Sequence, residues 1–327
     1  MYKRQLALRS VAEQGGEPWD GKASREGRLR QLVQERFPAL EVKDLTPILD
    51  GLRLIKSPRE IALIKKATRL STLAILEGMR STVPNLWEHE LDAVGKFVFY
   101  RHEAQGEAYF SLIASGPNAW FPHYNAGKRR MKDGELLLMD FAPDVGYYMS
   151  DVTRQWPVNG KWSPTQRELY GFYLACYKKI LATIAPGRTA KEIVAEAAAG
   201  MDGIVAATKF SKPSYEAAAR AFVKEYRESL DSYGLGHWVG MATHDVGRDA
   251  GPLRSGMVFT IEPQFRIPEE KLYIRLEDLI VIGDKSAELV SSDLPMEMDA
   301  IEKVMAEEGL LQKYPRDAAA DALVPLP

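Results

Sequence analysis

The sequence predicts an α+β fold, in which helices pack on one face of a sheet made of two similar halves. Helix pairs alternate with strand pairs along the chain, first over residues 57–158 and again over residues 163–283. Proline-containing capping boxes mark helix starts, and short apolar runs that end in acidic residues mark strands. The chain has 327 residues, of which 46% are hydrophobic, so it can bury a substantial core in one large domain or two smaller ones.

The first 45 residues carry too little apolar patterning to form a domain. We interpret residues 1–45 as the remnant of a truncated N-terminal domain, with one amphipathic helix over residues 25–37. Residues 46–56 are expected to be a linker, with Leu45–Lys56 as linker and entry strand. A signal peptide on a longer precursor would not be visible here, so the compartment stays open, with the cytoplasm as the default.

The helices are predicted mainly from their N-terminal signals. Ser57 and Ser163 each precede a proline at the first helical position, and Glu60 and Gln166 complete their capping boxes. Asn85 is expected to open the second helix. The expected helices are residues 57–79, 85–102, 163–184, 190–208 and 213–230.

Residues 134–158 are predicted to form two adjoining strands, each of which delivers one carboxylate. The apolar run Glu135–Phe141 contains Asp140, and after a turn the chain returns with β-type residues. The two-residue period of a strand places Asp151 and Thr153 on one face. Taken alone, these acids also fit ordinary turn aspartates and a strand-end cap.

Three further residues of ligand type occur downstream in similar settings. His237 lies in YGLGHWVG, Glu262 ends the apolar run Met257–Ile261, and Glu277 lies inside YIRLEDLIVIG. Carboxylates within apolar strands are rare unless they are paired or bound to metal. Four converging carboxylates need divalent cations to offset their charge, and this mixed oxygen and nitrogen set suits Mn, Zn, Co or Fe better than a lone Mg.

Composition excludes several other classes of protein. A net charge of −2 does not indicate the positive surface that binds nucleic acid or an anionic membrane. No apolar stretch approaches the roughly 20 residues that span a bilayer. The single cysteine, Cys176, excludes an intrachain disulfide framework and is expected to be a buried apolar residue.

The order of the motifs MDFA, SDVTR, GLGHWVGMATHDVG, GMVFTIEP and RLED resembles the pita-bread metallopeptidases, the superfamily of methionine aminopeptidase, prolidase and creatinase. Within it, the chain is most similar to the branch of Xaa-Pro aminopeptidases and prolidases (Xaa-Pro dipeptidases), over roughly Leu45–Leu310. The resemblance implies the pita-bread fold, a curved and mainly antiparallel sheet with helices on its outer face and two pseudo-symmetric halves. It implies a catalytic domain over residues 57–312 and a tail over residues 313–327.

The resemblance also implies a role for each ligand of a centre with two divalent metal ions. Asp140 would bind one ion, Asp151 and Glu277 would bridge both, and His237 with Glu262 would bind the other. Manganese is the expected metal, with cobalt, zinc and iron as alternatives.

The resemblance further implies residues that act on the substrate. His123, in the loop SGPNAWFPHYNAG, and His244 would hydrogen-bond a substrate carbonyl, and Glu262 or Glu277 would transfer a proton. The alternative for His123 is a solvated loop residue.

Two departures from the family pattern lie on the expected substrate side. Tyr233 stands where the branch usually has a histidine, and we expect its hydroxyl to take over a hydrogen bond to the substrate, the alternative being a ring that only packs. Gln264, Phe265 and Arg266 replace a usual glycine and aromatic.

The implied function is hydrolysis of N-terminal Xaa-Pro bonds in small peptides by an aminopeptidase or a dipeptidase, which could be a homodimer. Two alternatives remain: a catalytically weak or silent binding protein of the same fold, and another aminopeptidase or creatinase-type hydrolase. The five ligands argue against the metal-free creatinase type, and the lack of strongly basic or acidic tails argues against the binding protein.

Overall fold

The structure is a computed structural model that describes residues 24–229, 235–247 and 251–317. The chain divides into two compact units, Met1–Leu54 and Ile55–Pro327, and the division falls inside the expected linker. None of the helices in these described ranges combines the length and hydropathy that crossing a membrane requires.

The described part of the first unit contains helices α2 (Arg25–Arg36) and α3 (Thr46–Leu54). The first confirms the helix expected over residues 25–37. The second shows that the entry strand expected within Leu45–Lys56 was wrong. Apolar residues recur there at helical spacing, and the carboxylate of Asp44 accepts a hydrogen bond from the Thr46 amide at 2.8 Å, which supports a helix start.

The second unit begins its regular structure with α4 (Pro58–Ser81) and α5 (Glu88–Arg101). The capping box of α4 is present: Oγ of Ser57 accepts from the Glu60 amide at 3.4 Å, and the Glu60 carboxylate accepts from the Ser57 amide at 2.7 Å. Helix α5 starts three residues later than expected, because Asn85 has a φ of +74° and forms a turn.

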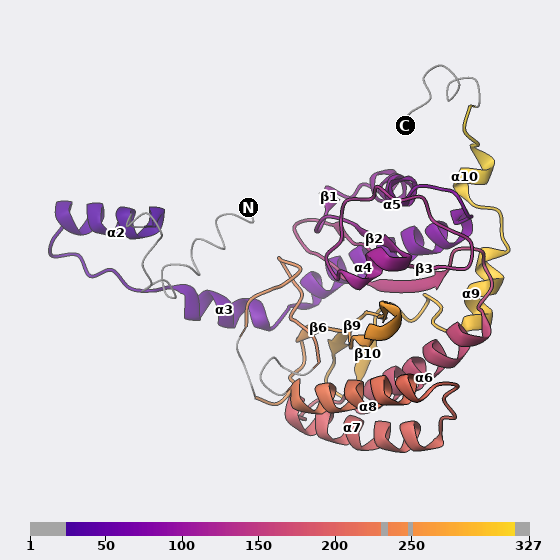
Figure 1. The fold of residues 1–327 in the computed structure, drawn as a ribbon. Coiled ribbons are helices and arrows are strands. Elements are labelled where there is room, and N and C mark those ends of the chain that lie inside the picture. Colours follow the sequence, from indigo (N-terminus) through magenta and orange to yellow (C-terminus); the bar gives the residue numbers. More distant parts are fainter. Residues whose placement is uncertain (1–23, 230–234, 248–250, 318–327) are drawn as a thin grey trace. The chain divides into compact units, whose positions relative to one another are not determined.

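Three more helices follow the first strands: α6 (Pro164–Leu181), α7 (Ala190–Ala207) and α8 (Pro213–Glu228). They confirm the helices expected there. Figure 1 shows them side by side, with α7 in contact with both neighbours. Short helices α9 (Met298–Met305) and α10 (Leu310–Lys313) lie near the end of the described chain.

Two antiparallel three-stranded sheets form the centre of this unit. The first has the order β2-β3-β5 and the second has the order β10-β9-β6. Their strands are β2 (Leu112–Ser115), β3 (Leu136–Asp140), β5 (Thr153–Pro157), β6 (Val258–Ile261), β9 (Asp278–Ile282) and β10 (Ala287–Leu289). Two smaller antiparallel pairs are β1 (Gly106–Glu107) with β4 (Pro143–Asp144) and β7 (Phe265–Ile267) with β8 (Leu272–Ile274).

A backbone bridge joins the two three-stranded sheets. Thr153 and Glu277 exchange hydrogen bonds of 3.2 Å and 3.1 Å, so the first residue of β5 faces the residue that precedes β9. The expected pairing of the strands on either side of the turn at residues 142–146 is confirmed, with Asp140 opposite Thr153, but the second strand begins at Thr153 and not at Tyr147 as expected. Residues 147–152 are irregular rather than strand, because the chain turns at Tyr147, which has a φ of +69°.

A buried ion pair lies directly beside this bridge. Arg154 and Asp278 are fully buried, and Nη2 lies 2.7 Å from Oδ1. Arg154 also donates to the carbonyl oxygens of Thr153 and Glu277, at 2.9 Å and 3.0 Å. The hydroxyl of Tyr177, from α6, donates to the other Asp278 oxygen at 2.7 Å. The Arg154–Asp278 ion pair therefore connects both three-stranded sheets and helix α6 at one place.

Aromatic side chains fill the space between α6, α8 and β7. Phe172, Phe222 and Phe265 lie with ring centroids 5.4–6.4 Å apart. Phe265 is fully buried there, so its expected position on the substrate side is wrong, since alternate residues of β7 face the core. The burial expected for Cys176 is confirmed.

Candidate metal centre

Five side chains converge where the two three-stranded sheets meet. Ligating atoms of Asp140, Asp151 and Glu277 all lie within 4.8 Å of one another, and so do those of His237, Glu262 and Glu277. Glu277 belongs to both groups. These are the five residues that the sequence singled out as metal ligands.

Strand register explains why four of these side chains meet. Asp140 ends β3 opposite Thr153, and Asp151 lies two residues before Thr153. Ile261 pairs with Asp278 across β6 and β9, which places Glu262 and Glu277 opposite each other one step further along. The backbone bridge between Thr153 and Glu277 then brings the two pairs of carboxylates together.

The backbone also fixes the position of His237. Its carbonyl accepts from the Thr260 amide at 2.9 Å, and its own amide donates to the Thr260 hydroxyl at 3.1 Å. This approach needs a glycine before it, because a Cβ on Gly236 would lie 2.1 Å from the Thr260 carbonyl oxygen.

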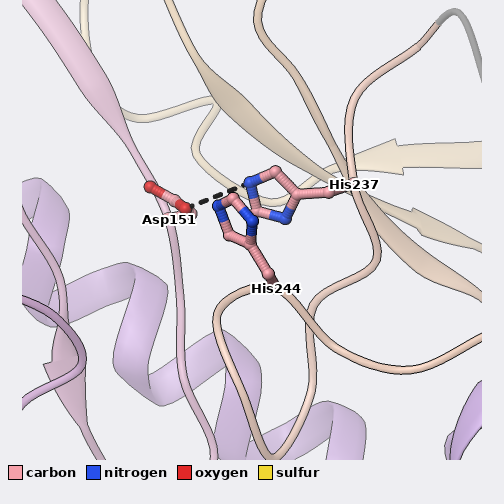
Figure 2. A group of neighbouring side chains, drawn as sticks. All are labelled: Asp151, His237 and His244. Atoms are coloured by element: carbon pink, nitrogen blue, oxygen red, sulfur yellow. Dashed lines mark ion pairs between the residues drawn. The ribbon is translucent and has the colours of Figure 1, made fainter. Parts of the chain in front are cut away.

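The imidazole of His237 points at the carboxylates. Its Nε2 lies 3.3 Å from Oδ2 of Asp151, 3.4 Å from Oε1 of Glu262 and 3.8 Å from Oε1 of Glu277. Figure 2 shows the contact with Asp151 and the ring of His244 stacked on that of His237, with centroids 3.9 Å apart. Asp151, His237 and His244 form a third group able to hold an ion.

The electrostatics of the centre favour bound cations. Burial, and then the charge of Asp140, raise the pKa of Asp151 to about 6. Burial, and then the charges of Asp151 and Glu262, raise the pKa of Glu277 well above its usual value. Among the described residues, the buried Oε1 of Glu277 has no hydrogen-bond partner. A divalent ion would satisfy this oxygen and offset the crowded negative charge.

His237 responds to the same negative charge. Its burial alone would lower its pKa, but the hydrogen bond to Asp151 and the charges of Asp151 and Glu262 outweigh this effect and raise the pKa to about 9. The imidazole thus lies where positive charge is stabilised.

Two residues that no sequence motif indicated as ligands also contact the five ligating side chains. The buried guanidinium of Arg275 contacts Asp140, and its Nη1 lies 3.4 Å from Oε2 of Glu262. The hydroxyl of Tyr109 lies 2.5 Å from Oδ1 of Asp140 and 2.7 Å from Oδ1 of Asp151, so its single proton lies between the two carboxylates. A charge inside the apolar segment YIRLEDLIVIG is a signal for Arg275, whereas nothing local marks Tyr109.

A cavity of about 410 Å³ opens beside the centre. The exposed side chain of His244 lines it, and desolvation at the cavity, followed by the charges of His237 and His123, lowers its pKa to about 4. Tyr233 lies outside the described residues. Other lining residues are Phe222, Glu225, Tyr226, Ser229, Leu235, Gly236, His237, Glu262, Pro263 and Gln264.

The three departures after Glu262 have different surroundings. Gln264 lines the cavity, as expected for a residue on the substrate side, and Phe265 lies in the core. The guanidinium of Arg266 stacks on the rings of Trp120 and Tyr273, at 5.8 Å and 5.1 Å from their centroids, and donates to Gln264 at 2.7 Å.

Several known proteins are similar to this chain in sequence and fold. The Xaa-Pro aminopeptidase of Haemophilus influenzae is 32% identical over 283 residues, which cover 81% of this chain and 64% of that protein. The Xaa-Pro dipeptidase of Pyrococcus furiosus is 30% identical over 272 residues, which cover 80% of this chain and 71% of that protein. The chain thus spans less than two thirds of the Haemophilus protein.

The solved structure of aminopeptidase P from E. coli with the inhibitor Pro-Leu matches with a TM-score of 0.75 and 28% identity, over 86% of this chain and 69% of that chain. Residues 62–284 match the model of metallopeptidase family M24, and this range holds all five converging side chains. The chain therefore belongs to metallopeptidase family M24 and has the pita-bread fold.

Proposed function

We propose that this protein is a peptidase that hydrolyses the first peptide bond of peptides with proline in second position. The observation that carries the proposal is the convergence of five ligating side chains in two groups that share Glu277. The names of the two relatives, an Xaa-Pro aminopeptidase and an Xaa-Pro dipeptidase, support the substrate class.

Two divalent metal ions fit the residues of the centre. Asp140 would bind one ion, His237 and Glu262 the other, and Asp151 with Glu277 would be shared. Two doubly charged cations balance the four carboxylates, and the ligand set is compatible with manganese, cobalt, zinc or iron. When bound, the ions would polarise the scissile carbonyl and lower the pKa of a water molecule.

The protein's own residues supply the proton transfers and the orientation. Glu262 faces both the ligand group and the cavity, so its carboxylate can take a proton from the attacking water and return it to the leaving nitrogen. His244, neutral near pH 7 because of its lowered pKa, can donate a hydrogen bond to the carbonyl oxygen as negative charge develops there. His123 would act beside it.

Proline is a shape that a rigid pocket can select. It lacks an amide N–H and has a fixed φ, so a site can favour it without reading its side chain by hydrogen bonds. The cavity beside His244 has walls from Phe222, Tyr226 and Pro263, which suits a compact apolar ring.

Metal analysis and three peptides test the proposal. We expect close to two transition-metal ions per purified chain, and cleavage of Ala-Pro-Ala but not of Ala-Ala-Ala. Cleavage of the dipeptide Ala-Pro would identify a dipeptidase, and its resistance would identify an aminopeptidase. Equal cleavage of Ala-Ala-Ala would contradict the preference for proline, and a metal-free, inactive protein would point to a silent binding protein instead.

Glu277→Ala tests the shared ligand. This variant should lose at least one ion by elemental analysis, because Glu277 belongs to both ligand groups. Glu288→Ala is the control, since its carboxylate is exposed and pairs with Lys65 at the surface. Full metal retention by Glu277→Ala would rule out a bridging role.

A further inference from the structure

A second buried carboxylate lies outside the metal centre. Glu88, the first residue of α5, is fully buried. A buried carboxylate is costly unless donors surround it, so its partners indicate what the residue is for.

The donors to this carboxylate come from one segment of the chain, residues 115–129. Oε1 accepts from the amide and the hydroxyl of Ser115, both at 2.8 Å, and from the side-chain amide of Asn118 at 3.0 Å. Oε2 accepts from the hydroxyl of Tyr124 at 2.8 Å and from the amide of Arg129 at 3.2 Å. The Glu88 amide in turn donates to the Arg129 carbonyl at 3.0 Å.

These bonds close residues 115–129 into a loop. Ser115 and Arg129 are its two ends, and Asn118 and Tyr124 lie within it, so one carboxylate holds both the ends and the interior. Arg129 also donates to the Ser115 hydroxyl at 2.8 Å, which reinforces the closure.

The loop carries His123 next to Tyr124. His123 is exposed, and among the described residues its side chain has no hydrogen bond that would hold it in place. Trp120 of the same loop packs against the guanidinium of Arg266, which lies 5.8 Å from the ring centroid, and Arg266 donates at 2.7 Å to Gln264, a residue of the cavity lining. The position of His123 therefore depends on the loop, and the loop depends on Glu88.

We propose that Glu88 is a positioning residue for the reaction: it fixes the loop of residues 115–129, which packs against the cavity lining through Arg266, so that His123 is held at the cavity. This inference rests on the proposed function, because it assigns His123 to the substrate. The hydrogen bonds of the Glu88 side chain go to the loop, and none of these partners lines the cavity or belongs to the five metal-ligating residues.

The chemistry requires a carboxylate at this position. Both oxygens of an ionised carboxylate only accept hydrogen bonds, and here each faces at least two donors. Glutamine has one acceptor oxygen, and its NH₂ group would face the donors on the other side. Glu88→Gln therefore keeps the volume of the side chain and removes the acceptor for one of the two sets of donors, which weakens this tether between Glu88 and the loop.

Two glutamates of helix α5 offer a matched pair of variants, Glu88→Gln and Glu90→Gln. Glu90 lies on the same first turn of α5, but its carboxylate accepts from the Trp87 amide at 2.6 Å and from Arg316 at 2.9 Å and does not touch the loop. The two variants thus differ in whether residues 115–129 lose a partner.

Hydrogen–deuterium exchange tests the tether without any need for activity. In Glu88→Gln we expect the backbone amides of residues 115–129 to exchange roughly 10-fold faster or more, because donors lose their buried acceptor. Exchange in α4 and the metal content should stay at parent values. Glu90→Gln should leave exchange in the loop unchanged.

Kinetics on Ala-Pro-Ala test the link to His123. We expect Glu88→Gln to lower kcat about 10- to 100-fold at nearly constant KM, because a donor to the developing charge is displaced. In a His123→Ala background the same substitution should have little further effect, since the two residues act as one unit. A purely structural role for Glu88 would instead give effects that multiply.

Unchanged exchange in the loop, or multiplicative kinetic effects, would overturn the proposal. If Glu88→Gln does not fold, Tyr124→Phe removes one donor to Glu88 and also the acceptor of the Lys128 amide. Exchange is therefore read at the amides of Ser115 and Arg129, which bond Glu88 directly; it should rise about 3-fold, and no rise there would overturn the tether. An inactive parent protein would overturn the proposed function, and the exchange experiment would still decide the tether.

Discussion

Replacing Asp278 by asparagine perturbs the buried ion pair that fastens the two sheets. Asp278 and Arg154 are fully buried, and Oδ1 lies 2.7 Å from Nη2. The carboxylate also accepts from the hydroxyls of Tyr177, at 2.7 Å, and Ser291. Asparagine keeps the size of the side chain, removes its charge and turns one acceptor into a donor.

The loss of folding free energy in Asp278→Asn arises from the positive charge of Arg154, which stays buried without its partner. Removing one partner of a buried pair costs about 3–5 kcal/mol, because the other charge stays buried without compensation. Arg154 keeps its hydrogen bonds to the carbonyls of Thr153 and Glu277, so we expect the lower end of this range, about 3 kcal/mol. For a domain of this size, that corresponds to a Tm lowered by roughly 6–12 °C.

Urea and thermal unfolding, followed by tryptophan fluorescence, measure the effect. Both are done in chelator, so that metal binding at the neighbouring Glu277 does not add to the stability. The control is Glu288→Gln, which breaks a pair with Lys65 of the same 2.7 Å length whose side chains are 53% and 40% exposed. We expect this change to cost less than about 1 kcal/mol.

Because the two ion pairs have the same length and differ in exposure, comparing the two variants separates the effect of burial on stability from that of distance. If Asp278→Asn costs no more than Glu288→Gln, burial does not make the Arg154–Asp278 pair more important for stability than an exposed pair. A double variant, Arg154→Met with Asp278→Leu, should be more stable than Asp278→Asn, because it leaves no unpaired buried charge.

Three further outcomes are expected. Tyr233→Phe should lower kcat/KM about 10- to 1,000-fold with unchanged metal content, as we propose that its hydroxyl donates to the substrate. Parent-like activity from about pH 6 to 9, where tyrosine is neutral, would show that the ring only packs. Tyr109→Phe should weaken metal binding about 10- to 100-fold in a chelator competition, because its hydroxyl orients Asp140 and Asp151; equal affinity would contradict that role. The buried Cys176 thiol, whose pKa burial raises to about 12, should react with a disulfide reagent at pH 8 only after unfolding, and rapid reaction of the folded protein would contradict its burial.

The sequence alone determined where most helices begin. The capping box of α4 joins Ser57 to Glu60, and the same pattern starts α6. These hydrogen bonds connect residues three apart, so local sequence contains all the information they need. The start of α5 was missed because Asn85 adopts a left-handed turn, where its amide donates to the carbonyl of the distant Met131.

The sequence also identified the five side chains that converge, because each lies in its own motif. It did not identify Tyr109 or Arg275, whose contacts are with residues far away in the chain. Arg275 meets Asp140 across 135 residues, and Tyr109 meets Asp151 across 42. Such contacts exist only after strands have paired.

The tertiary structure alone decided the register that assembles the centre. Asp151 and Glu277 come together because Thr153 and Glu277 bridge two separate sheets, and the Arg154–Asp278 pair lies beside that bridge. A shift of one residue at this bridge would turn the carboxylates to the opposite face, since side chains alternate along a strand. The strand propensity of these residues is nearly the same in either register. Only side-chain packing across the whole sheet therefore selects the register that forms the metal centre.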